Sequence, residues 1–414
     1  MVPSGWVRHL GSEITTKITK GSSPKWQGFD YQSEGTLFIT SENVRDGFLD
    51  VSKPKYLPLE FNQKLKNSQL QQGDILINIV GASIGRSCQY DLSEQQANIN
   101  QAVCLFRTNE LAESDFIQQY LQLPSTINRL LGTQSESARP NLSLSDMRDF
   151  LFALPPLPEQ RKIAKILSTW DKAIATTEKL IATSQQQKKA LMQQLLTGKK
   201  RLVDPDTGKV FEGKWERHSL SDLVYVDRKS LGKKTPDNFK FKYISLSNVD
   251  FGMISKELEV HEFSTAPSRA RRVLQDGDIL MSTVRPNLKG FAKVTSCYAD
   301  CIASTGFAVL TPKKKVSGDY IYQYIFSAHV TGQIDSLVVG SNYPAINSSD
   351  VSGLKVYCPA FEEQQKIASV LTAADKEIEF LEAKLAHLKE EKKALMQQLL
   401  TGKRRVKVSE TEAA

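Results

Sequence analysis

Two loops at corresponding positions contain the polar side chains best suited to contact nucleic-acid bases. Each follows the residues Gly-Asp-Ile-Leu, and the two loops differ in sequence: NIVGASIGRS at 78–87 and STVRPNLKGF at 282–291. Asparagine, serine, arginine and lysine are the residue types that meet base edges and phosphates. Loops that differ on a shared frame are also where binding specificity usually lies. The candidates for DNA contact are Asn78, Ser83 and Arg86 in the first loop and Arg285, Asn287 and Lys289 in the second.

Four further segments offer side chains of the same types. For each of them the alternative is an ordinary solvated loop. The basic runs at 269–272 and 313–315 predict phosphate contacts or plain surface rather than base contacts. The additional candidates are Gln134, Arg139 and Asn141 in TQSESARPN, Asn342 and Tyr343 in GSNYPAIN, Lys20, Ser22 and Lys25 in KGSSPKWQG, and Lys229 and Lys233 in DRKSLGKK.

Catalytic motifs are absent. The sequence has neither G-x-G-x-x-G nor G-x-x-x-x-G-K-[ST], so no dinucleotide or nucleoside triphosphate site is indicated. The string Pro205-Asp206 followed by Glu212-Gly213-Lys214 imitates a metal-nuclease pattern, but the segment is too short to supply the strands that present such groups. The five cysteines form no C-x-x-C pair, and no histidine has a catalytic partner at motif spacing. We therefore expect no catalytic residue, no metal site and no cofactor on this chain.

The sequence that must position these loops contains an internal repeat. Residues 155–201 return as residues 359–405 without a gap, at an offset of 204, with 25 of the 47 positions identical. The twelve residues KKALMQQLLTGK occur unchanged in both copies. The same offset relates LQQGDIL to LQDGDIL, and a shifted offset relates LFITSENV to YISLSNV. Each half is therefore a variable domain followed by a nearly constant segment.

The constant segments predict long helices that form a coiled coil. Pro158 and Glu159 suit a first helical turn, and Gly198 and Gly402 suit a C-terminal cap. Apolar residues between them follow a strict 4,3 spacing, which is typical of a coiled-coil seam. Two similar halves related by a two-fold axis would pair the helices antiparallel, and 39 helical residues would measure roughly 58 Å. The predicted seam residues are Ile163, Leu167, Trp170, Ile174, Ile181, Leu191, Leu195, Ile367, Leu371, Ile378, Leu381, Leu385, Leu388, Leu395 and Leu399.

The predicted fold is two α/β (α+β) domains, separated by two long helices that pair as an antiparallel coiled coil, with an internal pseudo-two-fold repeat. The expected boundaries are 1–154, 155–201, 202–356 and 357–405, with a tail at 406–414. Strands are expected at GDILINIV, GDILMSTV, QAVCLFRT and TGFAVLTP, and short helices at DFIQQYLQ and DYIYQYIF. The formal charge of +8 permits an anionic partner, and the absence of an apolar run or signal peptide indicates the cytoplasm and no membrane.

The chain resembles the specificity subunit of a type I restriction–modification enzyme. The resemblance lies in the duplicated LPPLPEQRKIAKIL…LMQQLLTGKKRL helices, each after a variable domain that opens with a tryptophan, Trp6 or Trp215. It covers nearly the whole chain, although Phe361-Glu362-Glu363-Gln364 replaces the Leu-Pro-Glu-Gln run in the second copy.

The resemblance implies two target recognition domains, each reading one half of a bipartite asymmetric target in double-stranded DNA. It also implies that the paired helices set the spacing and bind two modification (methyltransferase) subunits, which restriction/translocase subunits join. S-adenosylmethionine, ATP and Mg would then be bound by the partner subunits only. Leu180, Met192 and Leu196 are expected on outer faces of the first helix, available to a partner.

Two alternatives stay open at this point. One is a free-standing sequence-specific DNA-binding protein, such as a regulator, which would need no partner enzyme. The other is a coiled-coil scaffold whose globular halves bind proteins. The helix signature argues against the first alternative, and the unlike loops argue against the second.

Overall fold

The computed structural model describes residues 2–92, 95–132, 141–338 and 344–408. The chain forms two compact units, Met1–Glu178 with Lys384–Ala414 (unit 1) and Lys179–Ala383 (unit 2). Both long helices pass from one unit to the other, so each unit is described by itself. Within the described residues no helix combines the length and apolar content needed to cross a bilayer.

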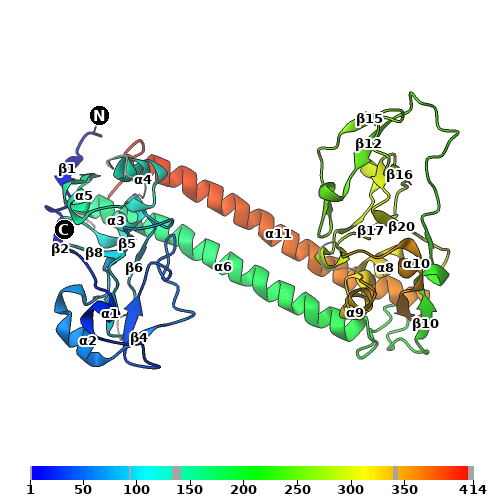
Figure 1. Cartoon of the computed structure of the whole chain (residues 1–414), viewed down its shortest axis with the longest axis horizontal. Helices are drawn as coiled ribbons and strands as arrows, with labels where there is room; N and C mark the ends of the chain where they lie inside the picture. The colour runs from blue at the N-terminus through cyan, green and yellow to red at the C-terminus, as the bar shows by residue number, and fades with distance from the viewer. Residues whose placement is uncertain (1, 93–94, 133–140, 339–343, 409–414) are drawn as a thin grey trace. The chain divides into compact units, whose positions relative to one another are not determined.

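Unit 1 contains three small sheets with short helices packed against them (Figure 1). The four-stranded sheet has the order β2-β8-β5-β6, the three-stranded sheet β4-β3-β7, and β1 pairs with β9. All pairs are antiparallel except β3 with β7. The strands are β1 Val7–Leu10, β2 Thr15–Lys20, β3 Thr36–Ile39, β4 Tyr56–Leu57, β5 Ile75–Asn78, β6 Ser87–Gln89, β7 Ala97–Ile99, β8 Val103–Thr108 and β9 Leu151–Leu154, and the helices are α1 Pro24–Gln27, α2 Leu59–Lys64, η1 Lys66–Ser68, α3 Ser114–Leu121, α4 Pro124–Leu131 and α5 Leu144–Asp149.

Unit 2 repeats this plan with its own strands. Its sheets have the orders β11-β20-β17-β18, β15-β12-β19-β16, β10-β21 and β13-β14, and β12 runs parallel to β19 as β3 does to β7. The strands are β10 Glu216–Ser219, β11 Val224–Val226, β12 Lys240–Ile244, β13 Val249–Asp250, β14 Met253–Ile254, β15 Val260–Glu262, β16 Ala270–Val273, β17 Ile279–Ser282, β18 Phe291–Lys293, β19 Ile302–Ser304, β20 Phe307–Pro312 and β21 Lys355–Cys358, and the helices are α7 Leu220–Leu223, η2 Leu246–Asn248, η3 Pro286–Leu288, η4 Ser296–Tyr298, α8 Gly318–Ile325, α9 Ala328–Leu337 and α10 Ser348–Gly353.

The predicted strands and short helices are confirmed. β5, β8, β17 and β20 lie on the segments expected to be strands, and α3 and α8 on those expected to be helices. From β5 onward nearly all equivalent elements keep the offset of 204 residues, as β8 and β20 do. The mixed α/β domains with a long helix after each are therefore the architecture that the repeat predicted. The domain boundaries themselves stay a prediction.

The long helices are α6 Leu157–Leu195 and α11 Phe361–Leu399. Each ends before a glycine with positive φ, 68° at Gly198 and 67° at Gly402, as the cap prediction requires. In each unit a segment of α6 lies beside a segment of α11 (Figure 1). Every residue of the predicted seam is buried or half-buried, while the positions between them are mostly exposed.

Half-buried ion pairs join the two helices to each other and to the globular domain in each unit. In unit 1, Lys392 Nζ lies 2.6 Å from Asp171 Oδ1, and Gln119 Nε2 of α3 donates to Asp171 Oδ2 at 2.7 Å. In unit 2, Lys188 pairs with Asp375, whose other oxygen accepts from α8. These partners meet only when α6 and α11 run in opposite directions in one register, so the ion pairs specify the antiparallel register.

A second ion pair joins the start of one long helix to the residues after the other. Arg405 Nε and Nη2 donate to the Glu159 carboxylate at 2.7 and 2.6 Å in unit 1. Arg201 makes the equivalent two bonds to Glu363 in unit 2, both at 2.7 Å. Glu159 and Glu363 are almost fully buried, so a bidentate guanidinium is the partner that their charge requires.

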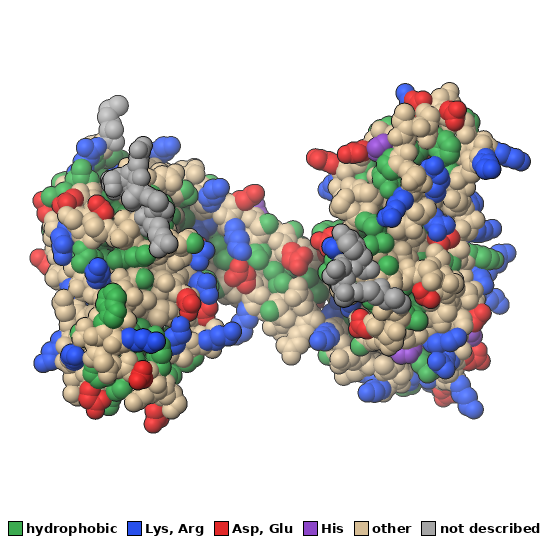
Figure 2. Space-filling model, viewed as in Figure 1, with side chains coloured by type: hydrophobic (Ala, Val, Ile, Leu, Met, Phe, Trp, Pro, Cys, Tyr) green, Lys and Arg blue, Asp and Glu red, His purple; other side chains and the backbone are tan. Residues whose placement is uncertain are grey.

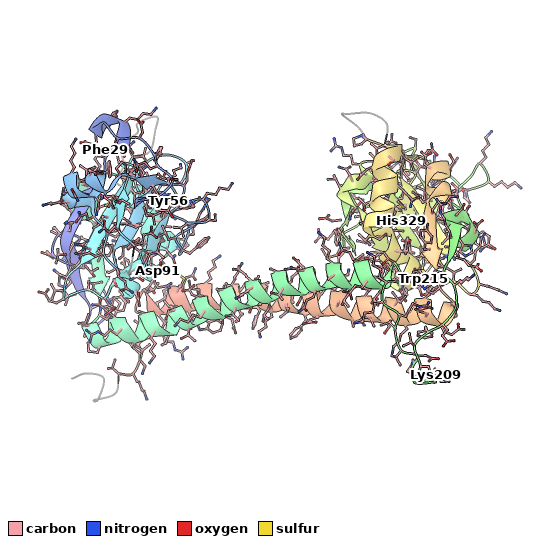
Figure 3. All side chains as sticks on the ribbon, turned by 90° about the horizontal axis from the view of Figure 1, so that it is seen from below. Phe29, Tyr56, Asp91, Lys209, Trp215 and His329 are labelled. Carbon is pink, nitrogen blue, oxygen red and sulfur yellow. The ribbon has the colours of Figure 1, made fainter. Side chains whose placement is uncertain are left out.

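The tryptophan that opens each domain packs on a helix end. A Cβ at Gly198 would lie 3.2 Å from Trp215 Cε2, and one at Gly402 would lie 3.2 Å from Trp6 Cε2 and closer still to Pro3 Cγ. This crowding and the positive φ both favour glycine at the two positions. Figure 3 shows Trp215 beside the end of α6, with Lys209 on the loop beyond it.

The expectation for the outer face of α6 is wrong for two of its three residues. Leu196 is 2% exposed in the hydrophobic core of unit 2, and Met192 packs against that core. The reason is that the last turns of α6 complete the core of the second domain. Leu180 is 48% exposed, as expected.

Candidate nucleic-acid interface

The two loops that follow β5 and β17 are closed by equivalent hydrogen bonds, although only the second contains a 3-10 helix, η3. The loop at 78–87 is closed by a hydrogen bond from Asn78 N to Arg86 O of 2.8 Å, and the loop at 282–291 by the bond from Ser282 N to Gly290 O of 3.2 Å. Divergent side chains therefore stand on one shared loop frame in both domains.

Each of these loops is joined to the second candidate loop of its domain. Val80 forms a bridge with Asn141, and Val284 forms the equivalent bridge with Ala345. Arg285 N also donates to Pro344 O at 2.7 Å. The fold thus brings together two segments that lie about sixty residues apart in the sequence.

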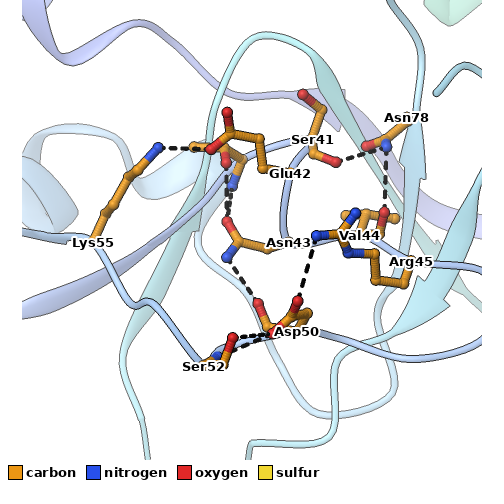
Figure 4. Close-up of polar contacts among 10 residues, drawn as sticks. Ser41, Glu42, Asn43, Val44, Arg45, Asp50, Ser52, Lys55 and Asn78 are labelled. Atoms are coloured by element: carbon orange, nitrogen blue, oxygen red, sulfur yellow. Dashed lines mark hydrogen bonds and ion pairs between the residues drawn. The ribbon is translucent and has the colours of Figure 1, made fainter. Parts of the chain in front are cut away.

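Asn78 is not at the surface position that the sequence predicted. Its side chain is completely buried, and Nδ2 donates to Ser41 O at 2.9 Å and to Val44 O at 3.5 Å (Figure 4). Nδ2 also donates to Ser83 Oγ at 3.0 Å. The expectation is corrected because the loop at 41–50 lies over the end of β5 and uses this amide to satisfy its backbone. Asn78 therefore supports the loop frame from inside the domain.

The other two candidates of the first loop also have partners within the domain. Ser83 is half-buried and accepts the bond from Asn78. Arg86 Nε lies 3.6 Å from Asp46 Oδ2, with 41% of the arginine side chain exposed. Only Arg86 keeps a charged group accessible to DNA.

The candidates of the second loop stand in a different setting. Arg285 and Asn287 are exposed, and Leu288 between Asn287 and Lys289 is 64% exposed. Lys289 is half-buried, and its Nζ donates to Phe326 O at 3.3 Å. Arg285 and Lys289 both have positive φ, 49° and 53°.

All the remaining described candidates except Ser22 are exposed, and Ser22 is half-buried. Lys20 ends β2 and Lys25 lies in α1, both exposed, while the Ser22 hydroxyl accepts from Gln27 Nε2 at 3.0 Å. Lys229 and Lys233 in unit 2 and Asn141 in unit 1 are exposed as well. Four candidates lie outside the described residues: Gln134, Arg139, Asn342 and Tyr343.

A cluster of cations around an exposed aromatic ring was missed by the sequence reasoning. Tyr225 of the edge strand β11 is 45% exposed, with Arg228 4.8 Å and Lys313 5.1 Å from its ring centroid. The cluster joins residues from two distant segments. The basic run at 313–315 is its only part that the sequence analysis singled out. Such a cluster suits a phosphate backbone, because it offers positive charge without a fixed base-pairing geometry.

Charged side chains of both signs are interspersed on the visible face of each unit (Figure 2). Part of the basic run at 269–272 is engaged inside the domain: Arg272 Nη2 lies 2.6 Å from Asp227 Oδ2, and Arg271 stacks 4.7 Å from the Phe263 ring. The visible face therefore has no single strongly basic surface to which DNA could bind by charge alone.

The described residues contain no cluster of metal-binding side chains, and three of their cysteine thiols are buried. No three His, Cys, Asp or Glu side chains there come together in a way that could hold a metal ion. Burial raises the pKa of Cys88, Cys104 and Cys358 to about 12, which makes these thiols poor nucleophiles. His329 packs against Tyr324 and Tyr357, and burial lowers its pKa.

The repeated helix segment has an exposed face that no core packing explains. Its buried residues, such as Leu195 and Leu399, are identical in both copies because both fill the same kind of core. Some of the exposed positions between them are identical as well, and four of these are separated by three, four and seven residues, which places them on one side of each helix. These exposed identical residues are Ala182, Lys189, Ala190 and Gln193 on α6 and Ala386, Lys393, Ala394 and Gln397 on α11.

Comparison with known families agrees with this architecture. The family model of the type I restriction modification DNA specificity domain matches residues 27–184 and 212–390. The type I restriction enzyme MjaVIII specificity subunit of Methanocaldococcus jannaschii is 26% identical, over 98% of this chain and 94% of that subunit. The EcoBI specificity subunit of Escherichia coli is 23% identical, over 58% of this chain and 52% of that subunit.

Two solved structures share the fold at low sequence identity. The S subunit of a type I restriction–modification system from M. genitalium is 14% identical with a TM-score of 0.60, covering 96% of this chain and 99% of that chain. A chain from a study of complex assembly and conformational transition of the type I R-M system is 18% identical with a TM-score of 0.55, covering 98% and 100%.

Proposed function

The chain belongs to the family of type I restriction–modification DNA specificity domains, and from this we propose that it is the non-catalytic DNA-recognition subunit of such a complex. Each of its two domains reads one half of a bipartite, asymmetric target in double-stranded DNA. The observation that carries the proposal is the repeated loop frame after β5 and β17. Equivalent backbone contacts close the loop and join it to the second loop in both domains, while the side chains differ, as two unlike half-sites require.

The candidate contacts divide by chemistry. Exposed lysines and the Tyr225 cluster supply phosphate contacts, which set affinity and position. Side chains of the paired loops, including the candidates outside the described residues, supply base contacts. Arg86 and Arg285 are the arginines of this second group.

Two methyltransferase subunits dock on the exposed identical faces of α6 and α11. A surface that is repeated exactly, although folding does not require it, suits one kind of partner bound twice. The partner subunits bring S-adenosylmethionine, and restriction subunits add ATP and Mg. In support of this division, the chain has no nucleotide-binding motif.

The docking proposal is tested with Gln193→Arg and Gln397→Arg together. We expect the double variant to keep its thermal unfolding midpoint, because both side chains are exposed, and to lose co-purification with the methyltransferase subunit. The control is Gln186→Arg with Glu390→Arg, exposed residues that differ between the two copies. Undiminished co-purification of the Gln193/Gln397 variant would place the partner interface elsewhere.

The function itself is tested by deleting the gene and sequencing methylated adenines in the host DNA. We expect a bipartite motif that is present with the gene, absent without it, and restored by complementation. A free-standing DNA-binding protein, the second candidate, would leave adenine methylation unchanged on deletion. Co-purification with a methyltransferase separates the two candidates independently.

A further inference from the structure

The Tyr225 cluster differs in charge from the equivalent place in the first domain. The turn after β20 begins at Lys313 and the turn after β8 at Asn109. The N–H groups of these two residues each donate to the carbonyl directly before the edge strand, β11 or β2, at 2.9 and 3.0 Å. The turns are therefore equivalent, but their sequences are Lys-Lys-Lys at 313–315 and Asn-Glu-Leu at 109–111.

The positive charge of the Tyr225 cluster is not neutralised by carboxylates. Arg228 and Lys313 lie 4.8 and 5.1 Å from the ring centroid of Tyr225, and the electron-rich face of the ring offsets the repulsion between them. Three further exposed cations adjoin the cluster in the chain: Lys229, Lys314 and Lys315. Among the described residues, none of these five cations is in an ion pair with a carboxylate. The surface therefore suits an anionic partner.

The Tyr225 cluster lies at the opposite end of the sheet from the loop at 282–291. β17 and β20 are antiparallel, and Ile279 at the start of β17 pairs with Leu310 near the end of β20. Tyr225 pairs with the next residue of β20, Thr311. The loop follows the other end of β17, which has four residues and measures about 13 Å. At about 3.4 Å per base pair, this length corresponds to about four base pairs.

Contacts of α8 with α11 show which side of the domain the cluster occupies. The turn with the three lysines leads into α8, whose N-cap Ser317 donates its N–H to Gln364 Oε1 near the start of α11, at 3.1 Å. Further along α8, Gln323 Nε2 donates to Asp375 Oδ2 at 2.7 Å. The C-cap of α8 accepts a bond from Lys289 Nζ of the loop. The cluster thus lies near the start of α11, and the loop lies nearer the point where α11 leaves the unit.

We infer that the Tyr225 cluster binds the phosphate backbone of DNA just outside the second half-site, and that the equivalent turn of the first domain makes no such contact. The paired helices set the spacing between the half-sites, so the flanking DNA lies on the side where α11 begins. Phosphate is the matching ligand, because the cluster offers several positive charges and no fixed geometry for a base edge. The inference rests on the proposed function and adds an asymmetry to it: one flank of the target is held by this chain and the other is not.

The test substitutes three exposed cations of this surface in one full-length chain: Arg228→Gln, Lys314→Gln and Lys315→Gln. Lys313 is kept because its Nζ is bonded to Ser221 O at 2.7 Å. The matched control removes the same charge from exposed lysines elsewhere in unit 2: Lys240→Gln, Lys242→Gln and Lys256→Gln.

Each chain is purified with its methyltransferase subunits, and its Kd for DNA is measured by fluorescence anisotropy at several salt concentrations. The duplexes contain the methylated motif with long flanks on both sides, or with one flank or the other removed. Thermal unfolding midpoints are measured on the same preparations. We expect the midpoints of both triple variants to equal that of the wild type, because all the substituted side chains are exposed.

The Arg228/Lys314/Lys315 variant should bind the duplex with both flanks about tenfold more weakly than the wild type, and its salt dependence should fall by about one in log–log slope for each lost phosphate contact. Removing one particular flank should abolish the difference between variant and wild type, whereas removing the other should leave it. The control should bind all duplexes as the wild type does.

Equal binding of the long duplex by this variant and the wild type would overturn the inference. An equal loss in the control would do so as well, since net charge would then explain the effect. A loss that persists whichever flank is removed would place the contact within the target instead. Unchanged DNA binding with loss of the methyltransferase subunits would assign the cluster to an acidic surface of that partner, which also overturns the inference. A wild-type complex without preference for a bipartite motif would contradict the proposed function itself, so the two failures are distinguishable.

Discussion

At the scale of single residues, the buried aspartates of the two Gly-Asp-Ile-Leu copies are stabilised by different partners. Asp74 and Asp278 are both 1% exposed, and each accepts a bond from the backbone N–H three residues before it. Asp74 also receives two bonds from Arg107, of 2.6 and 2.8 Å. Asp278 has the Thr311 hydroxyl instead, at 2.6 Å, and burial raises the pKa of its carboxyl. A neutral partner compensates a buried charge less well than a guanidinium does.

The first prediction concerns these two carboxylates. Asp74→Asn should destabilise the chain by about 1.5–3 kcal/mol, because Arg107 loses a charged partner. Asp278→Asn should cost little at pH 8. The measurement is thermal or urea unfolding of both variants beside the wild type. A larger loss of stability for Asp278→Asn than for Asp74→Asn would contradict the conclusion that Asp74 is the better compensated of the two carboxylates.

The pH dependence follows from the raised pKa of Asp278. The folded state binds this proton more tightly than the unfolded chain does, so the stability contribution is present below the ordinary value of 3.8. It is lost as the pH rises through the folded-state pKa. Asp278→Asn does not titrate, and its stability relative to wild type should therefore be higher at pH 8 than at pH 4. A constant difference across this range would exclude the effect.

At the scale of elements, the lysines in the seam decide how the helices pair. An apolar seam alone permits neighbouring registers, whereas Lys188 and Lys392 each need one aspartate on the opposite helix. The aspartates in turn bind glutamines of α3 and α8. These chains of bonds connect the coiled coil to the domain of the same unit, so they orient the domain as well as the helices.

The second prediction removes one such lysine. Lys392→Met should lower the free energy of unfolding by about 1–2 kcal/mol, since the lysine side chain is 13% exposed and Asp171 is 43% exposed. Lys393→Met changes the neighbouring exposed lysine and should be neutral. Combining Lys392→Met with Asp171→Leu should recover part of the loss. Additive losses in this double-mutant cycle would show that the pair is not coupled.

At the scale of the whole molecule, one DNA-specificity subunit is made from two copies of one design. The long helices contribute to both units, and their division at Glu178 and Ala383 falls at nearly equivalent positions, 205 residues apart. Because α6 and α11 have 39 residues each, the repeat preserves helix length as well as sequence. Equal lengths are what a spacing function requires.

The third prediction lengthens both helices. One heptad inserted after Lys179 and one after Ala383 adds about 10 Å of helix and keeps the 3.5-residue repeat. We expect the non-specific spacer of the methylated motif to grow by about 3 base pairs at about 3.4 Å each, with both half-sites unchanged. A heptad in α6 alone should instead mismatch the ion pairs and impair folding. An unchanged spacer in the doubly extended chain would refute the spacing role.

The repeat, four of the strands, two of the short helices, the two long helices and the family could be predicted from the sequence, because these depend on local periodicity and on a copy 204 residues away. The tertiary structure alone decided which candidates face solvent. It buried Asn78 beneath another loop, paired Arg405 with Glu159, and placed Leu196 in a core. These contacts join distant segments, which no periodicity encodes. It also revealed that Arg285 occupies a glycine's conformation, because backbone dihedral angles are set by the closed loop and not by residue type.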